Sequence, residues 1–359
     1  MDQFPLYRND EKWTWPLSRK QISALSSVKK DIENNTLKLV VNHCLCGNEK
    51  ENDDIVISEK DRYGFHIPQV LCKKCGLIRS KLVFSEESNE LFYKDYYRNL
   101  YTTGSPTNFF FFNQIKHGET FANILEKEGT LADIENVTEI GCGAGGILLP
   151  FQKRGKQVKG FDFNKEYLNF GSKYKLDLNF GDYSTQLEDD SCDLIILSHV
   201  LEHFLNPIKE IHNISKKIKL GKYLLVEIPS ILNIRSAYRN PILYFQNAHV
   251  YNFYQDYLKI FFEALGFEII YSDELCIFIC KKVREVQEPQ CIYGKNLEQK
   301  YQHIAKYFVN CQEKWQAPRN ILRRIALKMN SARMLYRFIY IFIWNLTHKN
   351  FVAKYQREL

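Results

Sequence analysis

The sequence lacks any apolar run that approaches the roughly 20 residues a transmembrane helix requires. Its densest apolar segment, Met334 to Leu346, is broken by Arg337 and Asn345 and is too short to span a bilayer. Met1 to Lys30 also lacks the basic, apolar and small-residue order of a secretory signal peptide. Ten cysteines without such a leader predict a reducing compartment, where thiols stay free or bind metal. We therefore expect a globular cytoplasmic protein.

Positive charge is scarce over most of the chain and gathers at its end. The formal net charge is +7, yet Lys314–Leu359 alone sums to +9, so residues 1–313 sum to −2. A nearly neutral body gives no strong nucleic-acid signal, because phosphate binding needs clustered cations. Helical spacing at Asn296–Trp315, Ile321–Met329 and Met334–Leu346 predicts a basic helical C-terminal region over 284–359. We expect this region to pack on the body or in a homo-oligomer, with a peripheral contact to an anionic membrane as the alternative.

Two close cysteine pairs stand about 25 residues apart in the N-terminal part of the chain. Cys44 with Cys46, and Cys72 with Cys75, are each followed by glycine and flanked by β-prone residues, which is typical of zinc-ribbon knuckles. Four thiolates at Zn–S distances of about 2.3 Å close a tetrahedral site and stabilise a small domain. We predict a zinc-binding module over 36–84, after a helical leader over 1–35. His43 is an alternative ligand, and four reduced cysteines are the metal-free alternative.

A tyrosine-rich stretch from Ser85 to Tyr101 follows the cysteine pairs and begins with a helix-start signal. Its simplest interpretation is an amphipathic connector that packs its aromatic side chains on the next domain. The alternative is a lid in which Tyr97, Arg98 or Tyr101 covers a bound cofactor. A helix is expected next over Asn108–Glu128, so 85–130 is predicted to be a helical connector or lid.

Strands and helices alternate from Val137 onward, which predicts a parallel sheet with helices on both faces. The first strand leads into a glycine-rich stretch, Gly141 to Gly146, which permits a tight turn before the first turn of a helix. Amide groups freed at such a helix start can receive a polar or anionic ligand group. A second strand ends at Asp162, whose carboxylate can accept hydrogen bonds from both ribose hydroxyls. The glycines also fit the dinucleotide fingerprint, so NAD is an alternative on this motif alone.

Three motifs resemble those of the class I S-adenosylmethionine (SAM) dependent methyltransferases, over about Asn136 to Lys282. They are Glu139 with Gly-x-Gly-x-Gly, the strand Asp193–Leu197 followed by Val200-Leu201-Glu202-His203 and Asn206-Pro207, and two final strands within 266–281, which this family places as an antiparallel pair at the sheet edge. Gly221–Pro229 is also similar to the family's fifth strand, which follows a helix that ends in glycine. The resemblance implies a Rossmann-like α/β fold over 131–283, with a seven-stranded sheet and helices on both faces. It implies SAM as cofactor, bound by Glu139, Gly141, Cys142, Gly143, Gly145, Asp162, Phe163, Asp182, Tyr183 and Ser198. A dehydrogenase fold requires neither Glu139 nor the final strand pair.

The cysteine pairs match a subset of this family with an N-terminal zinc module, found among methyltransferases of nucleotide-linked sugars and surface polysaccharide precursors. The resemblance therefore implies a small-molecule acceptor, most simply a sugar of a surface glycan pathway. One alternative is an RNA methyltransferase, which the neutral body and the lack of an Asn-Pro-Pro-Tyr-like motif after the fourth strand disfavour. Another is a non-catalytic scaffold protein that binds SAM.

Methyl transfer to a hydroxyl or an acidic carbon needs a base near neutral pH, for which histidine is suited. His199 and His203 follow the fourth strand. His249 lies in an insertion, Ser230–Tyr254, that is expected to form the acceptor pocket. We predict that His199, His249 or His203 is the base, and His203 has the structural alternative of ordering the loop beneath the cofactor.

Overall fold

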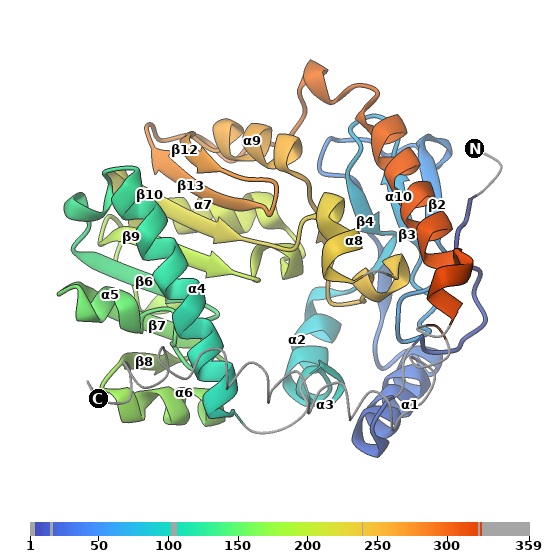
Figure 1. Cartoon of the computed structure of the whole chain (residues 1–359), viewed down its shortest axis with the longest axis horizontal. Helices are drawn as coiled ribbons and strands as arrows, with labels where there is room; N and C mark the ends of the chain where they lie inside the picture. Colours follow the sequence, from blue (N-terminus) through green and yellow to red (C-terminus); the bar gives the residue numbers. More distant parts are fainter. Residues whose placement is uncertain (1–3, 15–16, 102–105, 239, 322–323, 325–359) are drawn as a thin grey trace.

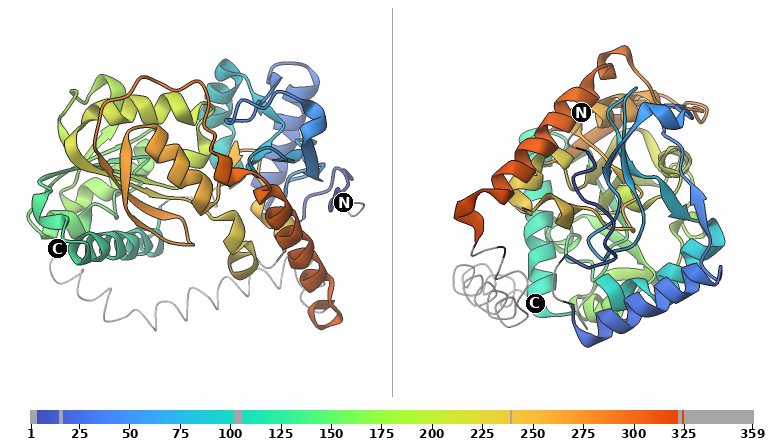
Figure 2. Two further views of the ribbon diagram at one scale, coloured as in Figure 1. Left: turned by 90° about the horizontal axis from the view of Figure 1, so that it is seen from above. Right: turned by 90° about the vertical axis from the view of Figure 1, so that its right-hand side faces the viewer.

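The computed structural model describes residues 4–14, 17–101, 106–238, 240–321 and 324. In Figure 1 a sheet flanked by helices lies on the left and a smaller β module on the right. Between them lie the short helices α2 (Glu86–Asp95), α3 (Tyr97–Tyr101) and α8 (Ile234–Ala237). Figure 2 shows the same arrangement from above and from the side of the β module.

Seven strands form the central sheet in the order β12-β13-β10-β9-β6-β7-β8. Their bounds are β6 (Asn136–Ile140), β7 (Gln157–Asp162), β8 (Asp177–Phe180), β9 (Cys192–Ser198), β10 (Ile218–Glu227), β12 (Phe267–Ser272) and β13 (Ile277–Lys282). The five strands from β10 to β8 are parallel, whereas β13 is antiparallel to both β10 and β12. The expected seven-stranded sheet with its antiparallel edge pair is confirmed.

The start of β10 differs from the expectation that a helix ends at Gly221. The strand begins at Ile218, directly after α7 (Pro207–Lys217). Its pairing with β9 shifts between Ile218 and Tyr223, and Gly221 has a φ of +82° within this irregular stretch. Helix ends and β-bulges both favour a residue that tolerates positive φ, so the glycine signal was assigned to the wrong feature.

Helices cover both faces of the sheet, as the alternation predicted. α4 (Asn108–Lys127), α5 (Leu149–Lys153) and α6 (Lys165–Gly171) lie on one face, and α7 and α9 (Gln255–Ala264) on the other. Leu194 and Ile196 of β9 join the core beneath α4, while Ile195 and Leu197 join the core beneath α7 and α9. A strand buried on both faces explains the continuous apolar run in its sequence.

The N-terminal part contains two small antiparallel sheets. β2 (Asp54–Ser58), β3 (Gln69–Cys72) and β4 (Ile78–Ser80) are neighbours in one, and β1 (Leu39–Val41) pairs with β5 (Leu82–Phe84) in the other. Arg79 on β4 binds both carboxylate oxygens of Asp54 at 3.0 and 2.8 Å, and this pair is almost fully buried. Below these sheets α1 (Arg19–Glu33) packs on α3, and the Ser18 side chain caps its start.

The larger of these sheets takes its fourth strand from the distant insertion. β11 (Tyr251–Asn252) pairs with β4, which gives the order β11-β4-β3-β2. The amide of Ser80 donates to the carbonyl of Val250 at 3.0 Å, and its hydroxyl donates to the carbonyl of His249 at 3.1 Å. The core on the α7 side of the central sheet also continues into the residues around the four paired cysteines. The two halves of the chain therefore share a sheet and a core.

The helix expected at Asn296–Trp315 is α10 (Lys300–Gln316), which begins four residues later. It packs on the β module, and its Phe308 ring stacks on Phe245 of the insertion with the ring centres 5.6 Å apart. The basic and apolar segments predicted over 322–359 lie outside the described residues, apart from residue 324. No helix in the described part of the chain is long and apolar enough to cross a bilayer.

Candidate active site

The glycine-rich segment after β6 forms a tight loop at the carboxyl edge of the sheet. Gly141, Gly143 and Gly145 have φ values of +73°, +56° and +71°, which favour glycine. The segment continues as turns, and α5 begins only at Leu149. The expectation of a helix starting directly after the glycines is wrong.

Protein acceptors occupy most of the amide groups of this loop. Gly143 donates its amide to Oδ2 of Asp162 at 2.9 Å, and Gly146 donates to Oε1 of Gln114 at 3.3 Å. The amides of Gly141 and Cys142 bond to the carbonyl of the β7 residue Phe161. A dinucleotide pyrophosphate would need such amides as free donors. The loop therefore does not present the donors that the NAD alternative requires.

Carboxylates gather where β6 and β10 end. Glu139 is buried, and its Oε2 has no hydrogen-bond partner among the described residues. Burial, together with the carboxylates of Asp162 and Glu227, raises the pKa of Glu139 well above its usual range. Glu227 accepts hydrogen bonds from the Ser198 hydroxyl at 2.6 Å and from Nδ1 of His117 at 3.1 Å. The carboxylates of Asp162 and Glu227 favour a cationic ligand at this edge over an anionic pyrophosphate.

Beside the loop, Asp162 and two aromatic rings form an exposed corner. Phe163 follows Asp162 directly and is 71% exposed, and Phe180 at the end of β8 is 51% exposed. Their ring centres are 6.3 Å apart in an edge-to-face arrangement. Exposed aromatic rings beside a carboxylate suit a nucleoside, with the base on the rings and the ribose on the acid.

Asp182 and Tyr183, which were also predicted to bind the cofactor, lie in the turn after β8. Both side chains make other contacts there. Asp182 is exposed, and its carboxylate accepts from the amide and hydroxyl of Ser184 at 2.9 and 2.6 Å. The Tyr183 side chain is buried in the core on the α7 side of the sheet. Phe180, which forms the exposed corner with Asp162 and Phe163, was not predicted from the sequence.

Three histidines and Glu202 come together beyond the carboxyl end of β9. His199 has a φ of +58°, and its Nδ1 lies 3.5 Å from Oε1 of Glu202. Its Nε2 lies 3.8 Å from Oε2 of Glu227. Burial opposes charge on this imidazole, but the two carboxylates outweigh it and raise the pKa of His199 to about 9. The two carboxylates therefore favour the protonated form of His199.

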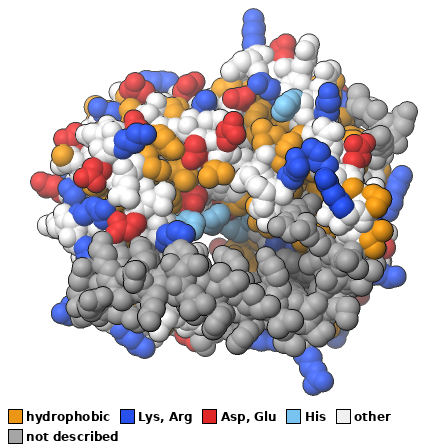
Figure 3. Space-filling view, in the orientation of Figure 1, with side chains coloured by type: hydrophobic (Ala, Val, Ile, Leu, Met, Phe, Trp, Pro, Cys, Tyr) orange, Lys and Arg blue, Asp and Glu red, His pale blue; other side chains and the backbone are white. Residues whose placement is uncertain are grey.

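His203 and His249 are neutral partners in the same cluster. Nδ1 of His203 lies 2.8 Å from the carbonyl of Ala248, so it carries the proton and leaves Nε2 as an acceptor. Burial lowers the pKa of His203 and lowers that of His249 well below its usual range. The ring centres of His203 and His249 are 5.0 Å apart. Figure 3 shows histidine side chains together near the middle of the molecular face.

The four paired cysteines are buried and lie close together. The Cys44 sulfur is 3.5 Å from the sulfurs of Cys46 and Cys75, and the Cys46 sulfur is 3.7 Å from that of Cys72. Sulfurs bound tetrahedrally at about 2.3 Å from an ion are about 3.8 Å apart, so the four thiols fit one zinc ion. His43 is exposed and lies outside this cluster.

Comparison with known proteins agrees with this geometry. The model of a family described as "Methyltransferase domain" matches residues 111–272. This match covers less than half of the chain and indicates a methyltransferase domain within those residues. A solved SAM-dependent methyltransferase from Archaeoglobus fulgidus is similar at 22% identity and a TM-score of 0.36, covering 53% of this chain and 87% of its own. One from Methanosarcina mazei is similar at 20% identity and a TM-score of 0.35, covering 42% and 94%. No curated protein matches the chain.

The methyltransferase domain is joined to the β module through the residues that hold its histidines. The amide of Val250 donates to the carbonyl of Glu202 at 2.9 Å, directly beside the carbonyl of His249 that accepts from Ser80. The amide of Asn247 donates to the carboxylate of Asp61 at 3.0 Å. The position of His249 thus depends on the β module as well as on the sheet.

The tyrosine-rich helices lie over the same edge of the methyltransferase domain. Arg98 on α3 lies 3.8 Å from Oδ1 of Asp162, and its guanidinium lies over the Tyr167 ring. Tyr97 packs beside His203, and Tyr101 donates a hydrogen bond to Asn247. The residues predicted for a lid therefore contact both Asp162 of the exposed corner and the histidine cluster.

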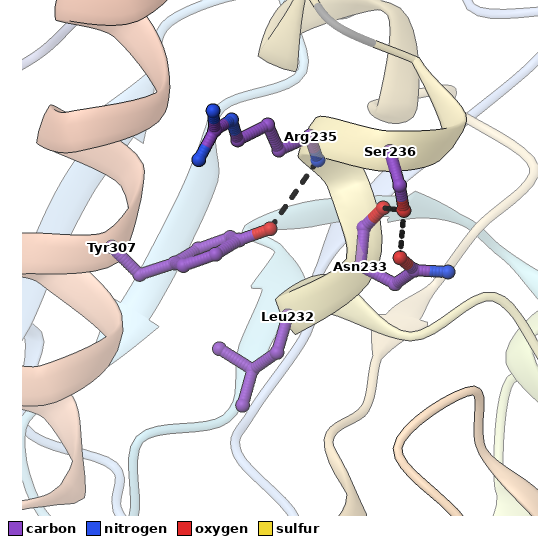
Figure 4. A pocket seen from close by; sticks show the side chains of 5 residues that line it. All are labelled: Leu232, Asn233, Arg235, Ser236 and Tyr307. Atoms are coloured by element: carbon purple, nitrogen blue, oxygen red, sulfur yellow. Dashed lines mark hydrogen bonds between the residues drawn. The ribbon is translucent and has the colours of Figure 1, made fainter.

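A separate open pocket lies between the insertion and α10. Figure 4 shows its lining, in which the Tyr307 hydroxyl accepts from the Arg235 amide at 3.3 Å. The lining residues are Leu232, Asn233, Arg235, Ser236 and Tyr307. None of the site residues predicted from the sequence lines it.

Gly141 offers a test of the glycine loop. Replacing Gly141 with alanine forces a side chain into φ +73° and places its Cβ 2.6 Å from a methyl group of Val200. Backbone strain and overpacking together are expected to cost about 2–4 kcal/mol of unfolding free energy. Chemical denaturation measures this cost. Gly155→Ala is the matched control for φ, because Gly155 has φ +78° and open space around its Cβ.

Proposed function

We propose that this chain transfers the methyl group of SAM to a hydroxyl of a small-molecule acceptor, a sugar or nucleotide-linked sugar. The supporting observation is the double role of Glu227. It accepts from Ser198 and His117 at the cofactor edge, and it lies 3.8 Å from His199 of the histidine cluster. A methyl donor at the carboxylates and an acceptor at the histidines would therefore be adjacent, as an in-line displacement requires.

The neighbouring side chains suit a hydroxylated ring as acceptor. His203 and His249 are neutral imidazoles that can take a hydroxyl proton, and protonated His199 can donate to a second oxygen. Tyr93 and Tyr97 lie beside His203, with ring centres 6.4 and 6.2 Å from it. Aromatic and hydrogen-bonding groups in one site favour an acceptor with both an apolar ring face and hydroxyls.

We also propose that Cys44, Cys46, Cys72 and Cys75 hold a structural zinc ion. The four buried sulfurs leave no position for a substrate, which is typical of structural zinc sites. The ion would fix the β module, and the module in turn positions the insertion that carries His249.

Calorimetric titration tests the cofactor assignment. We expect SAM and its product S-adenosylhomocysteine to bind at one site per chain, and NAD not to bind, because the loop amides are occupied and the edge is acidic. Binding of NAD without binding of SAM would reverse the assignment. Release of S-adenosylhomocysteine on addition of nucleoside diphosphate sugars then tests the acceptor. SAM binding without turnover for any acceptor would favour the scaffold alternative.

A further inference from the structure

We propose that Glu202, His203 and His249 bind a divalent transition-metal ion, at a site separate from the four cysteines. Each of the three residues offers one ligand atom, and these atoms lie within 4.8 Å of one another. Ligands at about 2.1 Å from a shared ion are at most about 4.2 Å apart, so binding needs only a small inward movement. The residues come from two segments that β11 and the carboxyl end of β9 bring together.

The carboxylate of Glu202 is the strongest sign of a missing ligand. The residue is 2% exposed, and neither Oε1 nor Oε2 has a hydrogen-bond partner among the described residues. Leaving a buried carboxylate without donors is costly, and such groups are usually paired or bound to a metal. The nearest charged group is His199, whose Nδ1 forms an ion pair with Oε1 of Glu202 at 3.5 Å, the limit of hydrogen-bond distance. The His199 side chain is 51% exposed, so it has room to turn away when an ion binds.

The two imidazoles are arranged as metal ligands commonly are. Metal-binding histidines usually donate their second ring N–H to a carbonyl or carboxylate, which fixes the free nitrogen toward the ion. Nδ1 of His203 lies 2.8 Å from the Ala248 carbonyl and leaves Nε2 available. His249 is 5% exposed, and its Nε2 is hydrogen-bonded to the Gln246 side chain and lies 4.0 Å from Oε1 of Glu202. Its Nδ1 has no partner in the described part of the chain, so an ion would bind Nδ1 or displace Gln246 from Nε2.

The ligand set indicates which ions fit. Two imidazoles and one carboxylate favour manganese, iron, cobalt, nickel or zinc, whereas magnesium and calcium prefer oxygen ligands alone. Three protein ligands leave coordination positions open for water or for an oxygen of the acceptor. The site therefore has the ligand number of a catalytic centre, in contrast to the closed four-cysteine cluster.

The role of the ion rests on the proposed function, although the ion site does not. His203 and His249 would no longer take the hydroxyl proton when they hold the ion. An acceptor hydroxyl bound to the ion would instead have a lowered pKa and would lose its proton to a neighbouring water. Its oxygen then forms the new bond to the methyl carbon of SAM. The bond from sulfur to that carbon breaks, and its electron pair stays on sulfur, so the sulfonium becomes the thioether of S-adenosylhomocysteine. This role of the ion applies only to acceptors that present a hydroxyl group.

Manganese is the probe that separates this site from the cysteine cluster, because thiolates select softer ions such as zinc. We expect the full chain, with its zinc content measured, to bind one Mn²⁺ in the absence of SAM and acceptor. Titration followed by electron paramagnetic resonance measures this stoichiometry. Glu202→Gln is expected to weaken Mn²⁺ binding at least about 30-fold, and His303→Asn, an exposed histidine on α10, to leave it unchanged.

Melting temperature and SAM affinity measure whether the variant still folds and binds its cofactor, separately from Mn²⁺ binding. Glu202→Gln keeps the size of the buried side chain and loses only its ion pair with His199, so its melting temperature should stay close to that of the parent, and its SAM affinity should be retained. The absence of Mn²⁺ binding by the parent, or equal binding by Glu202→Gln, would overturn the metal site. Mn²⁺ binding that fails to stimulate methylation of any hydroxyl acceptor would leave the site standing and overturn its role in the proposed function.

Discussion

Asp162→Asn is expected to weaken SAM binding about 10- to 150-fold while the fold is retained. We expect the carboxylate to accept hydrogen bonds from the ribose hydroxyls, and it already accepts from the Gly143 amide at 2.9 Å. A hydrogen bond to a charged group contributes about 1.5–3 kcal/mol, and each 1.4 kcal/mol is a tenfold change in affinity. The asparagine keeps the shape of the side chain but loses its charge. Isothermal titration with SAM measures the difference directly.

Asp177→Asn is the matched control for this variant. Asp177 is an exposed acid on β8, and the hydrogen bond recorded for its side chain comes from Asn179 within the same strand. The same chemical change there should leave SAM affinity within a factor of two. Unchanged affinity in Asp162→Asn would show that the cofactor does not use this carboxylate, and equal losses in both variants would indicate a general effect of net charge.

The double variant Cys72→Ser and Cys75→Ser is expected to lose one zinc ion per chain and at least about 10 °C of melting temperature. Structural zinc sites contribute on the order of 10 kcal/mol to folding, and each kcal/mol corresponds to a few degrees. Loss of the zinc ion should also alter the active site. The Ser80 amide donates to the Val250 carbonyl, and the Val250 amide donates to the Glu202 carbonyl. Zinc analysis, thermal unfolding and hydrogen exchange at the Val250 amide measure the three effects.

Cys291→Ser controls for the removal of a thiol. Cys291 is exposed and belongs to no cysteine cluster among the described residues. Its variant should keep both the zinc ion and the melting temperature of the parent. A parent protein that purifies without zinc, or a double variant with unchanged exchange at Val250, would contradict the proposed link between the cysteines and the acceptor site.

The sequence predicted well those features that depend on local order along the chain. The buried run in β9 and the helix α4 followed from their own sequence patterns, and the antiparallel pair of β12 and β13 followed from the family resemblance. Gly221 was assigned wrongly because the same backbone requirement occurs at helix ends and at bulges.

The features that were missed depend on contacts between distant segments. Nothing in Tyr251–Asn252 marks it as a strand, because a two-residue strand has no detectable period and its partner β4 lies far away in the sequence. Gln114 and His117 stand in an ordinary helical pattern, and only the packing of α4 brings them to the glycine loop and to Glu227. Glu227 itself could have been found, since it ends a strand at the edge where Ser198 and Asp162 were predicted.

The N-terminal sheet takes its fourth strand, β11, from a distant segment, so this sheet cannot be completed until that segment has been synthesised. Ser80 and His249, which are hydrogen-bonded, are 169 residues apart in the sequence. At about 5–20 residues per second, the ribosome needs roughly 10–30 seconds to supply the missing strand after the first three have emerged. During that interval β4 is an unpaired edge, open to pairing with a neighbouring nascent chain. Early zinc capture by the cysteines would hold the first three strands together until the insertion arrives.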